Sequence, residues 1–272
     1  MNCVKTIMIS CAFMYCCSSS SNSKVLDDLA PSDFGEWQIA VVKESPGSHA
    51  SIDILDSEGR LIKSIIEPGR TWSLTWSSDG HSLGFMSDRL IAAQAPIAPP
   101  NDPFYQPPGH VFVMKPEDGQ LTQITVGASK SWSPRIAPDG RQIVFLSDQE
   151  SRGDLYLSPT QNPSITRLTK DKNWPLEGAQ WLSPSEIMFN TFVGDTLEVF
   201  RMNVLDHTSK QVHLDAPQGS KAGYLAVSHN RKRLAFTIRD RNLDAQKGII
   251  NPQLYIIELD GGRRRRLTLR YS

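Results

Sequence analysis

The stretch that decides the fold is Ser131–Asp148, with the sequence SWSPRIAPDGRQIVFLSD. It predicts a β-strand, a tight turn and a second β-strand. In the turn Ala137-Pro138-Asp139-Gly140, proline fixes φ at about −65°, aspartate bonds the neighbouring backbone and glycine accepts a left-handed conformation. The second strand, Ile143-Val144-Phe145-Leu146, is apolar on both faces, which is expected of a strand that packs between two neighbouring sheets.

Variants of this stretch recur along the chain, and each is followed by two further β-rich runs. Equivalent second-strand positions are separated by 44, 60, 44 and 47 residues, at Ile39, Leu83, Ile143, Ile187 and Leu234. The longest interval holds an insertion, residues 90 to 109, with six prolines: Pro96, Pro99, Pro100, Pro103, Pro107 and Pro108. A period of roughly 40–50 residues with four strands per unit is typical of a β-propeller.

We therefore expect residues 25–272 to form one all-β domain, a β-propeller of about five four-stranded blades. Six blades, or an incompletely closed ring, are the alternatives. A single repeat cannot bury both faces of its sheet, so the repeats must stack on one another around an axis. A chain of 272 residues is long enough to build such a core as one domain.

Residues 1–24 have a different composition from the rest. All four cysteines lie in the first 17 residues, which excludes a disulfide framework for the folded part. Lys5 precedes an apolar run, Thr6 to Tyr15, that is too short to span a bilayer. Cys16 and Cys17 are then followed by a serine-rich stretch. We expect an export signal or lipoprotein-like tether with lipidation at Cys17 or Cys16, or else a poorly ordered tail.

Four stretches resemble the TolB-like, WD-repeat-like propeller repeat of bacteria: Trp76–Gly80, Phe85–Arg89, Ala137–Gly140 and Phe145–Asp148. A closing pattern of the type Gly-x-x-x-x-Leu-Thr is similar, loosely at Gly119 to Thr122 and again at Gly262 to Thr268. The resemblance covers roughly residues 35 to 269. It implies a periplasmic propeller that binds other envelope proteins or ligands. The lipoprotein-like segment adds the expectation that the protein is anchored to the outer membrane.

Three carboxylates are candidate catalytic residues. Asp88, Asp148 and Asp240 each follow the second strand of a repeat, and equivalent positions of a propeller converge near one face. A carboxylate cluster there could carry general acid and base chemistry, as in glycoside hydrolysis. The alternative is structural, because an aspartate at a strand end bonds the backbone N–H groups of the loop. The residue types favour the structural interpretation.

Aromatic residues offer two further candidates. Four tryptophans lie on or near leading strands and are expected in the core between blades rather than in a sugar-binding platform: Trp72, Trp76, Trp132 and Trp181. Phe104 and Tyr105 lie at the centre of the proline-rich insertion. Loops longer than about 12–15 residues are usually functional or without fixed structure, so this insertion is a candidate partner-binding loop.

Composition and motifs exclude several functions. The 29 basic and 29 acidic residues give zero formal charge, so nothing favours nucleic-acid binding. No nucleophile elbow, metal-ligand motif or phosphate-binding loop occurs, and we expect no metal and no cofactor. The sequence favours a non-enzymatic binding or scaffold protein of the bacterial envelope whose partner is another protein or a small ligand, without deciding the question of catalysis. The alternative is a carbohydrate-active hydrolase or lyase.

Overall fold

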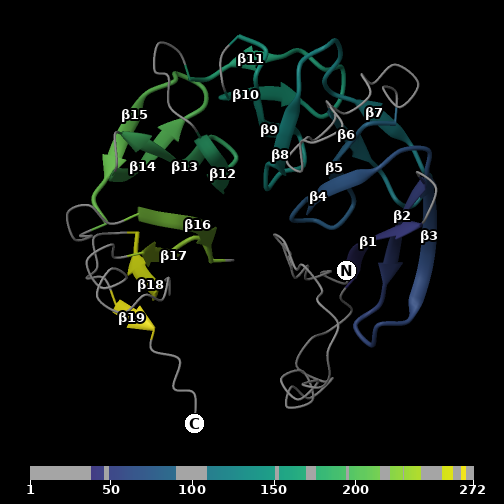
Figure 1. Ribbon diagram of the computed structural model, residues 1–272, viewed down its shortest axis with the longest axis horizontal. Coiled ribbons are helices and arrows are strands. Elements are labelled where there is room, and N and C mark those ends of the chain that lie inside the picture. Colours follow the sequence, from purple (N-terminus) through teal and green to yellow (C-terminus); the bar gives the residue numbers. More distant parts are fainter. Residues whose placement is uncertain are drawn as a thin grey trace, which may run out of the picture. The chain divides into compact units, whose positions relative to one another are not determined.

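The computed structural model describes residues 38–45, 49–89, 109–150, 153–169, 176–193, 196–214, 221–228, 230–239, 253–259 and 265–267. These residues form β-strands and turns without a helix, and therefore without a helix that could cross a membrane. Within them, five separate antiparallel sheets follow one another along the chain (Figure 1). The predicted all-β architecture with about five sheets is confirmed.

The first two sheets contain the strands β1 (Ile39–Ser45), β2 (His49–Leu55) and β3 (Leu61–Glu67), then β4 (Thr71–Trp76), β5 (Leu83–Ser87), β6 (His110–Met114) and β7 (Leu121–Gln123). The third contains β8 (Ser131–Ile136), β9 (Gln142–Ser147), β10 (Asp154–Pro159) and β11 (Thr166–Arg167). The fourth contains β12 (Leu176–Ser183), β13 (Glu186–Val193), β14 (Thr196–Asn203) and β15 (Ser209–Val212). The fifth contains β16 (Lys221–Val227), β17 (Arg233–Arg239), β18 (Gln253–Glu258) and β19 (Arg265–Leu267).

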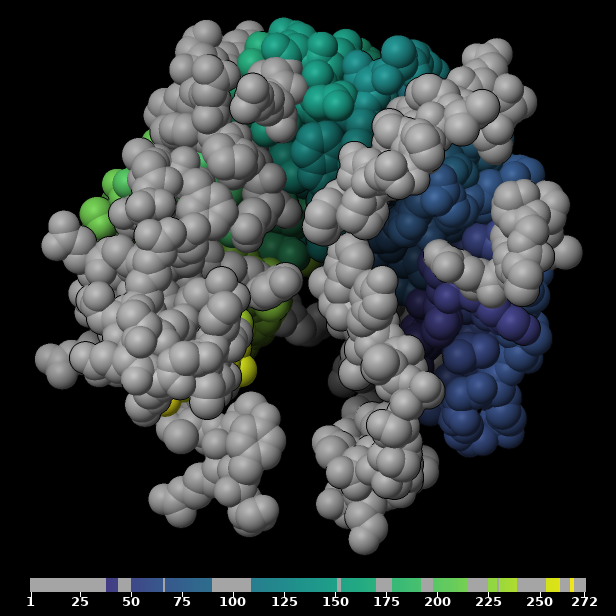
Figure 2. All heavy atoms as spheres, in the orientation of Figure 1, coloured from purple at the N-terminus to yellow at the C-terminus, as the bar shows by residue number. Residues whose placement is uncertain are grey.

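Within the described residues, the first sheet has three strands and the other four sheets have four strands each. Its strands correspond to the second, third and fourth strands of the other sheets, because Ile39 on β1 is the repeat equivalent of Leu83 on β5. The segment that would precede β1 lies outside the described residues. In Figure 2, atoms of this sheet are coloured purple to blue. On β3, Leu61 and Ile62 are 60% and 53% exposed.

The chain divides into two compact units. Unit 1 extends to Ile143 and includes Pro159–Pro163, and unit 2 contains Val144–Ser158 and the chain from Ser164 onward. The first two sheets belong to unit 1 and the last two to unit 2, while the third sheet is divided between them.

The predicted turn after the leading strand is present in three sheets with the same hydrogen bonds. In the third sheet, Ala137 N–H donates to the Gln142 carbonyl at 2.7 Å and Gly140 N–H donates to the Ala137 carbonyl at 2.9 Å. Gly140 has φ of 71°, as predicted, and Gly80 has 76°. In the fifth sheet, Arg231 takes the glycine position with φ of 58°. An arginine in this left-handed conformation carries a conformational cost that glycine does not.

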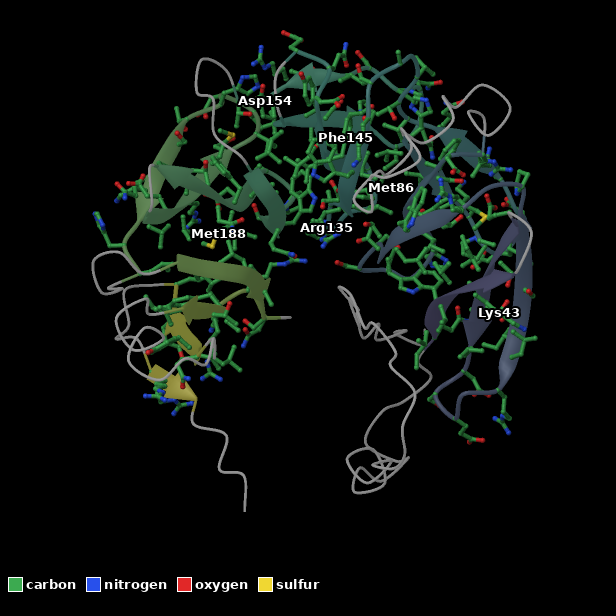
Figure 3. All side chains as sticks on the ribbon, viewed as in Figure 1. Lys43, Met86, Arg135, Phe145, Asp154 and Met188 are labelled. Carbon is green, nitrogen blue, oxygen red and sulfur yellow. The ribbon has the colours of Figure 1, made fainter. Side chains whose placement is uncertain are left out.

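The core of each unit is built from a repeated aromatic pair. A ring on the second strand stacks on a ring on the third strand in four of the sheets: Phe85 on Phe112, Phe145 on Tyr156, Phe189 on Phe200 and Phe236 on Tyr255. In unit 1, Phe85 and Phe112 pack on Ile52 and Ile54 of the preceding sheet. Figure 3 shows Met86, Phe145 and Met188 inside their sheets, whereas Lys43 lies at the surface.

The first sheet has no such aromatic pair. At the equivalent cross-strand position it pairs Val41 with Asp53, and Val41 is 41% exposed. The Asp53 carboxylate accepts hydrogen bonds from the hydroxyls of Ser51 at 3.1 Å and Ser64 at 2.6 Å. Strand β2 therefore alternates between buried and half-buried residues, whereas β5 and β6 are buried on both faces. This explains why the first repeat is hard to see in the sequence.

The closing pattern of the repeat ends with a threonine. Its hydroxyl accepts a hydrogen bond from a backbone N–H of the third strand. Val111 N–H donates to Thr125 Oγ1 at 2.9 Å, and Leu155 N–H donates to Thr169 Oγ1 at 3.0 Å. The residue before each threonine is buried, Ile124 in one sheet and Leu168 in the other. The first closing motif is therefore Gly119 to Thr125, and its placement at Thr122 from the sequence was wrong by three residues.

Candidate functional site

Asp88 follows β5, as predicted, and both of its carboxylate oxygens are bonded to Arg70. Oδ1 accepts the Arg70 backbone N–H at 2.7 Å and Oδ2 accepts Arg70 Nε–H at 3.1 Å. The Asp88 backbone N–H donates in turn to the Arg70 carbonyl at 3.3 Å. The residue is only 5% exposed. These bonds fit the structural interpretation, in which the aspartate caps the backbone at the strand end.

A second ion pair lies beside this cap. Arg89 Nη1 is 3.0 Å from Glu67 Oε2, and the two side chains are 18% and 3% exposed. The Arg89 guanidinium also lies over the ring of Phe112, 5.5 Å from its centroid. Burial raises the pKa of Glu67 and the positive charge of Arg89 opposes that rise. Together the two ion pairs join the segment Glu67–Arg70 to Asp88–Arg89, and we call this arrangement the double clamp.

Of the remaining predicted site residues, Asp148 alone lies within the described residues. Asp148 is exposed at the end of β9, in unit 2. Asp240, the lipidation candidates Cys16 and Cys17, and the loop residues Phe104 and Tyr105 lie outside the described residues. No group of three or more His, Cys, Asp or Glu side chains suited to a metal ion occurs in the described part of the chain.

The four tryptophans fall into two classes. Trp76 and Trp181 are 5% and 7% exposed, and they lie in the core as predicted. Trp72 and Trp132 are only half-buried, so the core prediction is wrong for these two. Both are the second residue of a leading strand, β4 and β8, and both precede a serine with positive φ, Ser73 at 54° and Ser133 at 52°.

Each half-buried tryptophan carries a cation two residues earlier in the chain. The Arg70 guanidinium lies 5.3 Å from the centroid of the Trp72 ring, and Lys130 Nζ lies 5.7 Å from that of Trp132. Both distances are within the range of about 6 Å for cation–π attraction. Residues i and i+2 of a strand point to the same side, which places each cation on its ring. We call Arg70, Trp72, Lys130 and Trp132 the cation–tryptophan face.

Gly109 holds the two halves of this face together. Its carbonyl accepts the N–H of Ser131 at 2.9 Å, between Lys130 and Trp132. A Cβ at Gly109 would lie 3.7 Å from Cζ3 of Trp72 and only 2.8 Å from the terminal methyl of Met86. The starts of β4 and β8 therefore meet at Gly109, where a larger residue would have to displace the terminal methyl of Met86.

Two titratable groups of the second and third sheets have pKa values shifted by burial, His110 on β6 and Arg135 on β8. His110 Nδ1 lies 3.2 Å from Thr125 Oγ1, and burial lowers the pKa of His110, which favours the neutral ring. Arg135 extends from β8 (Figure 3) and its Nη1 donates to the Pro134 carbonyl at 2.7 Å. Burial lowers the pKa of Arg135, but a guanidinium keeps its charge in proteins. Asp88 and Glu67 are buried, and each is paired with an arginine.

The sequence contains a signal for this face. A cation, a small hydroxyl residue, tryptophan and serine occur in the same order twice, as Arg70-Thr71-Trp72-Ser73 and Lys130-Ser131-Trp132-Ser133. Apolar periodicity assigns such tryptophans to the core. The half-buried state of the two tryptophans goes with two features that the sequence does not reveal. One is the positive φ of the serine that follows each tryptophan, and the other is the bulge between Trp72 and Thr75 in β4.

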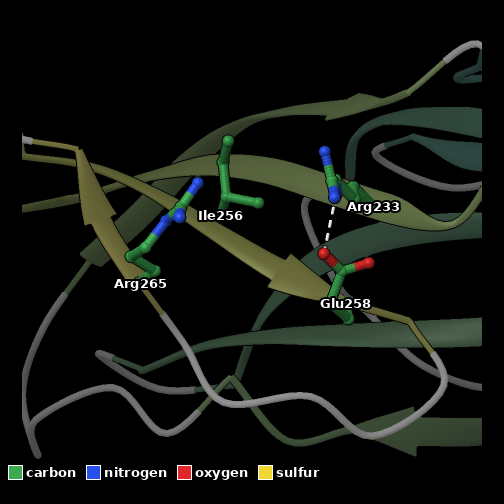
Figure 4. Close-up of a pocket in the computed structure, with 4 residues that line it drawn as sticks. All are labelled: Arg233, Ile256, Glu258 and Arg265. Carbon is green, nitrogen blue, oxygen red and sulfur yellow. Dashed lines mark hydrogen bonds and ion pairs between the residues drawn. The ribbon is translucent and has the colours of Figure 1, made fainter.

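Unit 2 contains a small pocket on the fifth sheet (Figure 4). It encloses about 190 Å³ and is lined by Arg233, Ile256, Glu258 and Arg265. Arg233 Nε is bonded to Glu258 Oε1 at 2.7 Å, and both side chains are exposed. Ligand sites for small molecules usually enclose about 300–1,000 Å³. The cation–tryptophan face is therefore the stronger candidate.

Comparison with known proteins establishes the class of fold. No family model matches the chain. It is similar to TolB from Acinetobacter baumannii, with a TM-score of 0.61, 18% identity and coverage of 85% of this chain and 52% of TolB. It is also similar to the β-propeller domain of the Trilobed protease from Pyrococcus furiosus, with a TM-score of 0.56, 11% identity and coverage of 88% and 69%. The protein is thus a TolB-like β-propeller in fold, with about five blades.

Other similar proteins are enzymes or parts of enzymes. An oligogalacturonate lyase from Vibrio parahaemolyticus gives a TM-score of 0.62 with 15% identity, covering 86% of this chain and 64% of the lyase. A Tricorn-like protease N-terminal subunit from Sulfurisphaera tokodaii is 27% identical over 110 residues, 38% of this chain and 55% of the subunit. The chain thus spans about half the length of TolB and of this subunit. At these identities the structural likenesses define the fold, not the activity.

Proposed function

We propose that this protein is a non-enzymatic binding or scaffold propeller of the bacterial cell envelope, and that it holds another envelope protein at the cation–tryptophan face. The observation that carries the proposal is the repetition of a half-buried tryptophan beside a cation on two neighbouring leading strands. Tryptophan and arginine are the residues most enriched at the energetic centres of protein interfaces. The use of Asp88 as a backbone cap supports a binding role over a catalytic one.

The envelope location is part of the same proposal. Residues 1–24 are proposed to act as an export signal, with Cys17 or Cys16 carrying a lipid. Labelling cells with a fatty-acid analogue tests the anchor in the wild-type protein and in variants with serine at each of the two cysteines. Label that depends on one of them assigns the site, and absence of label in the wild type removes the lipid from the proposal.

The binding role is tested by capture from envelope extracts. The full chain and its double variant Trp72→Ala/Trp132→Ala are immobilised at equal amounts. Leu205→Ala is the control, because Leu205 is a 73% exposed apolar residue in unit 2. We expect a partner that the wild type and Leu205→Ala retain and the double variant loses, with unchanged melting temperatures. Equal capture by all three proteins would contradict the proposal.

A second function, a carbohydrate-active hydrolase or lyase, is favoured by the likeness to oligogalacturonate lyase. It is tested by incubating the protein with oligogalacturonate and following both the ultraviolet absorbance of an unsaturated product and the release of reducing ends. Activity that is lost in Asp148→Asn or Asp240→Asn would establish the enzyme and displace the scaffold proposal. No turnover leaves the binding role as the better account.

A further inference from the structure

The zero formal charge of the chain conceals an uneven distribution of its charged residues. Residues 221–272, which include the fifth sheet, contain 12 basic and 4 acidic residues and carry a formal charge of +8. Residues 1–220 contain 17 basic and 25 acidic residues and carry −8. Such a concentration of one sign gives the fifth sheet a positive potential, although the whole chain is neutral.

The described residues of the fifth sheet and its turns show the same excess of positive charge. They include a single carboxylate, Glu258, and seven cations: Lys221, Arg231, Lys232, Arg233, Arg239, Arg265 and Arg266. Arg233 Nε is bonded to Glu258 Oε1 at 2.7 Å, and Arg266 donates to the neutral amide oxygen of Gln253. Neither contact changes the net charge of these residues, which stays positive.

Four of these cations are exposed, and we call them the basic rim: Lys232, Arg233, Arg265 and Arg266. The first two lie where β17 begins, and the other two lie on β19, the outer strand of the sheet. Adjacent residues of a strand point to opposite faces, so Arg265 and Arg266 flank the outer edge on both sides. Figure 4 shows Arg265 on the face that also carries Arg233, with Ile256 between them.

The kind of cation in this segment favours phosphate as the ligand. Arginine accounts for 9 of the 12 basic residues in 221–272, compared with 8 of 17 in residues 1–220. The planar guanidinium binds two oxygens of a phosphate at once, which the point charge of lysine does not do. The pocket beside Arg265 encloses about 190 Å³, several times the roughly 30 Å³ that one water molecule occupies in the liquid, so a phosphate group fits there.

The surroundings of the basic rim differ from those of a nucleic-acid site. Single-stranded nucleic acids are bound by exposed aromatic rings on which the bases stack. The aromatic pair of this sheet, Phe236 and Tyr255, is stacked ring on ring and contributes to the core of unit 2. The pocket beside the basic rim is lined instead by the aliphatic Ile256 and by charged side chains. This arrangement favours a ligand that is recognised by its charge and its phosphates alone.

We propose that the basic rim attaches the protein to a membrane surface rich in anionic phospholipids, with headgroup phosphates beside Arg265 and Arg266. The choice of a lipid surface rests on the proposed location in the envelope. A single lipid chain gives weak and reversible membrane binding, and a basic patch supplies a second attachment that makes the binding stable. Each cation near an anionic surface contributes about a fivefold increase in membrane affinity.

The test measures binding of the full-length protein to lipid vesicles by co-sedimentation. The protein carries Cys16→Ser and Cys17→Ser, so that no attached lipid contributes. Anionic vesicles contain phosphatidylglycerol in a background of phosphatidylcholine, and vesicles of pure phosphatidylcholine are the control. We expect at least about tenfold tighter binding to the anionic vesicles at about 0.1 M salt. This preference should disappear at about 1 M salt, where charges more than about 3 Å apart are screened.

A matched pair of double variants locates the binding surface. Lys232→Ala/Arg265→Ala removes two charges of the basic rim and should weaken binding to the anionic vesicles about 25-fold. Lys43→Ala/Lys210→Ala removes two exposed lysines from the first and fourth sheets, with the same change in net charge. It should weaken binding less than about threefold, because those lysines lie outside the basic rim. Thermal unfolding checks that both variants are folded.

The outcomes separate this inference from the proposed function. Equal binding to both kinds of vesicle, or equal losses in the two double variants, overturns the inference. Binding of a DNA duplex without binding to anionic vesicles would show that the polyanion is a nucleic acid and would also overturn it. Capture of an envelope partner depends on Trp72 and Trp132 in unit 1, not on the basic rim. Capture without vesicle binding therefore rejects this inference alone, and vesicle binding without capture rejects the proposed partner binding alone.

Discussion

Glu67 Oε2 and Arg89 Nη1 are 3.0 Å apart and nearly inaccessible to water, yet neither atom has a hydrogen-bond partner of acceptable geometry among the described residues. The pair therefore has charge attraction without the directed bonds that usually accompany it in protein interiors. This explains why the effect of burial on the pKa of Glu67 is larger than the opposing effect of the Arg89 charge, so that this pKa is raised above 4.5. The pair joins the end of the first sheet to the second sheet within unit 1.

The first prediction concerns the pH dependence of stability. Because the pKa of Glu67 is raised in the folded state, the native protein binds more protons than the unfolded chain between the two pKa values. The contribution of Glu67 to the free energy of unfolding is thus fully present below about pH 4.5 and falls as the pH rises through the folded-state pKa. Glu67→Gln should remove this fall, so its stability relative to the wild type should increase from pH 4 to pH 7.

Urea unfolding across that pH range measures the effect. Asp56 supplies a control of opposite sign, since bonds to Arg60 lower its pKa and its contribution is lost as pH falls. In unfolding measurements extended below pH 3.8, Asp56→Asn should therefore lose stability relative to the wild type as the pH rises, and above that pH the difference should stay nearly constant. Parallel curves for the wild type and Glu67→Gln would show that Glu67 titrates normally.

The second prediction tests the close contact in the double clamp. A Cβ at Gly69 would lie 2.5 Å from Asp88 Oδ1 and 2.7 Å from the backbone N and Cα of Arg89. Gly69→Ala must displace this backbone and should cost about 1–3 kcal/mol of unfolding free energy. Gly59→Ala is the control, because open space surrounds Gly59 and its φ of 79° alone should cost about 1 kcal/mol. Chemical denaturation measures the free energy of unfolding of both variants. Equal losses of stability would mean that the backbone at Arg89 can shift without an energetic cost.

The third prediction concerns the closing threonines. Thr125→Val leaves the buried N–H of Val111 without its acceptor and should cost about 1–2 kcal/mol. Thr169→Val should cost more, about 2–3 kcal/mol, because the bond from Thr169 Oγ1 to the carboxyl oxygen Asp154 Oδ1, at 2.6 Å, is shorter and stronger than the 3.2 Å contact of Thr125 Oγ1 with His110 Nδ1. Thr122→Val, at the position first expected to close the repeat, should change stability by less than about 0.5 kcal/mol. A larger loss in Thr122→Val than in Thr125→Val would return the closing role to Thr122.

The fourth prediction is a stabilising substitution. Arg231 holds the left-handed turn position that glycine occupies as Gly80 and Gly140 in the other sheets. Arg231→Gly removes the conformational cost of the left-handed arginine, about 1–2 kcal/mol. Part of this gain is lost again, because glycine increases the conformational entropy of the unfolded chain. We expect a net gain of about 0.5–1 kcal/mol in thermal or chemical unfolding. Gly140→Ala should show the reverse, and a loss of stability in Arg231→Gly would mean that the arginine side chain makes a contact of its own.

Local chemistry explains what could be predicted from the sequence. The turn at Ala137–Gly140 and the doubly buried strand after it are determined by neighbouring residues, and both were predicted correctly. The double clamp was not predicted, because Glu67 and Arg89 are 22 residues apart and lie in different sheets. The half-buried state of Trp72 and Trp132 was missed for a similar reason: it depends on a bulge and on two serines in a conformation that serine rarely adopts.

The double clamp has a consequence for how the protein can be altered. Asp88 and Arg89 are tied to Arg70 and Glu67, and the chain returns at Gly109, whose carbonyl is bonded to Ser131. Both ends of the sequence between them are thus fastened to the sheets by contacts that do not involve that sequence. Closing a longer loop between fixed ends adds little entropy cost. The sequence between Arg89 and Gly109 is therefore a suitable site for insertions. A foreign peptide or a reporter domain can be placed there, next to the cation–tryptophan face, without changing the residues of the sheets.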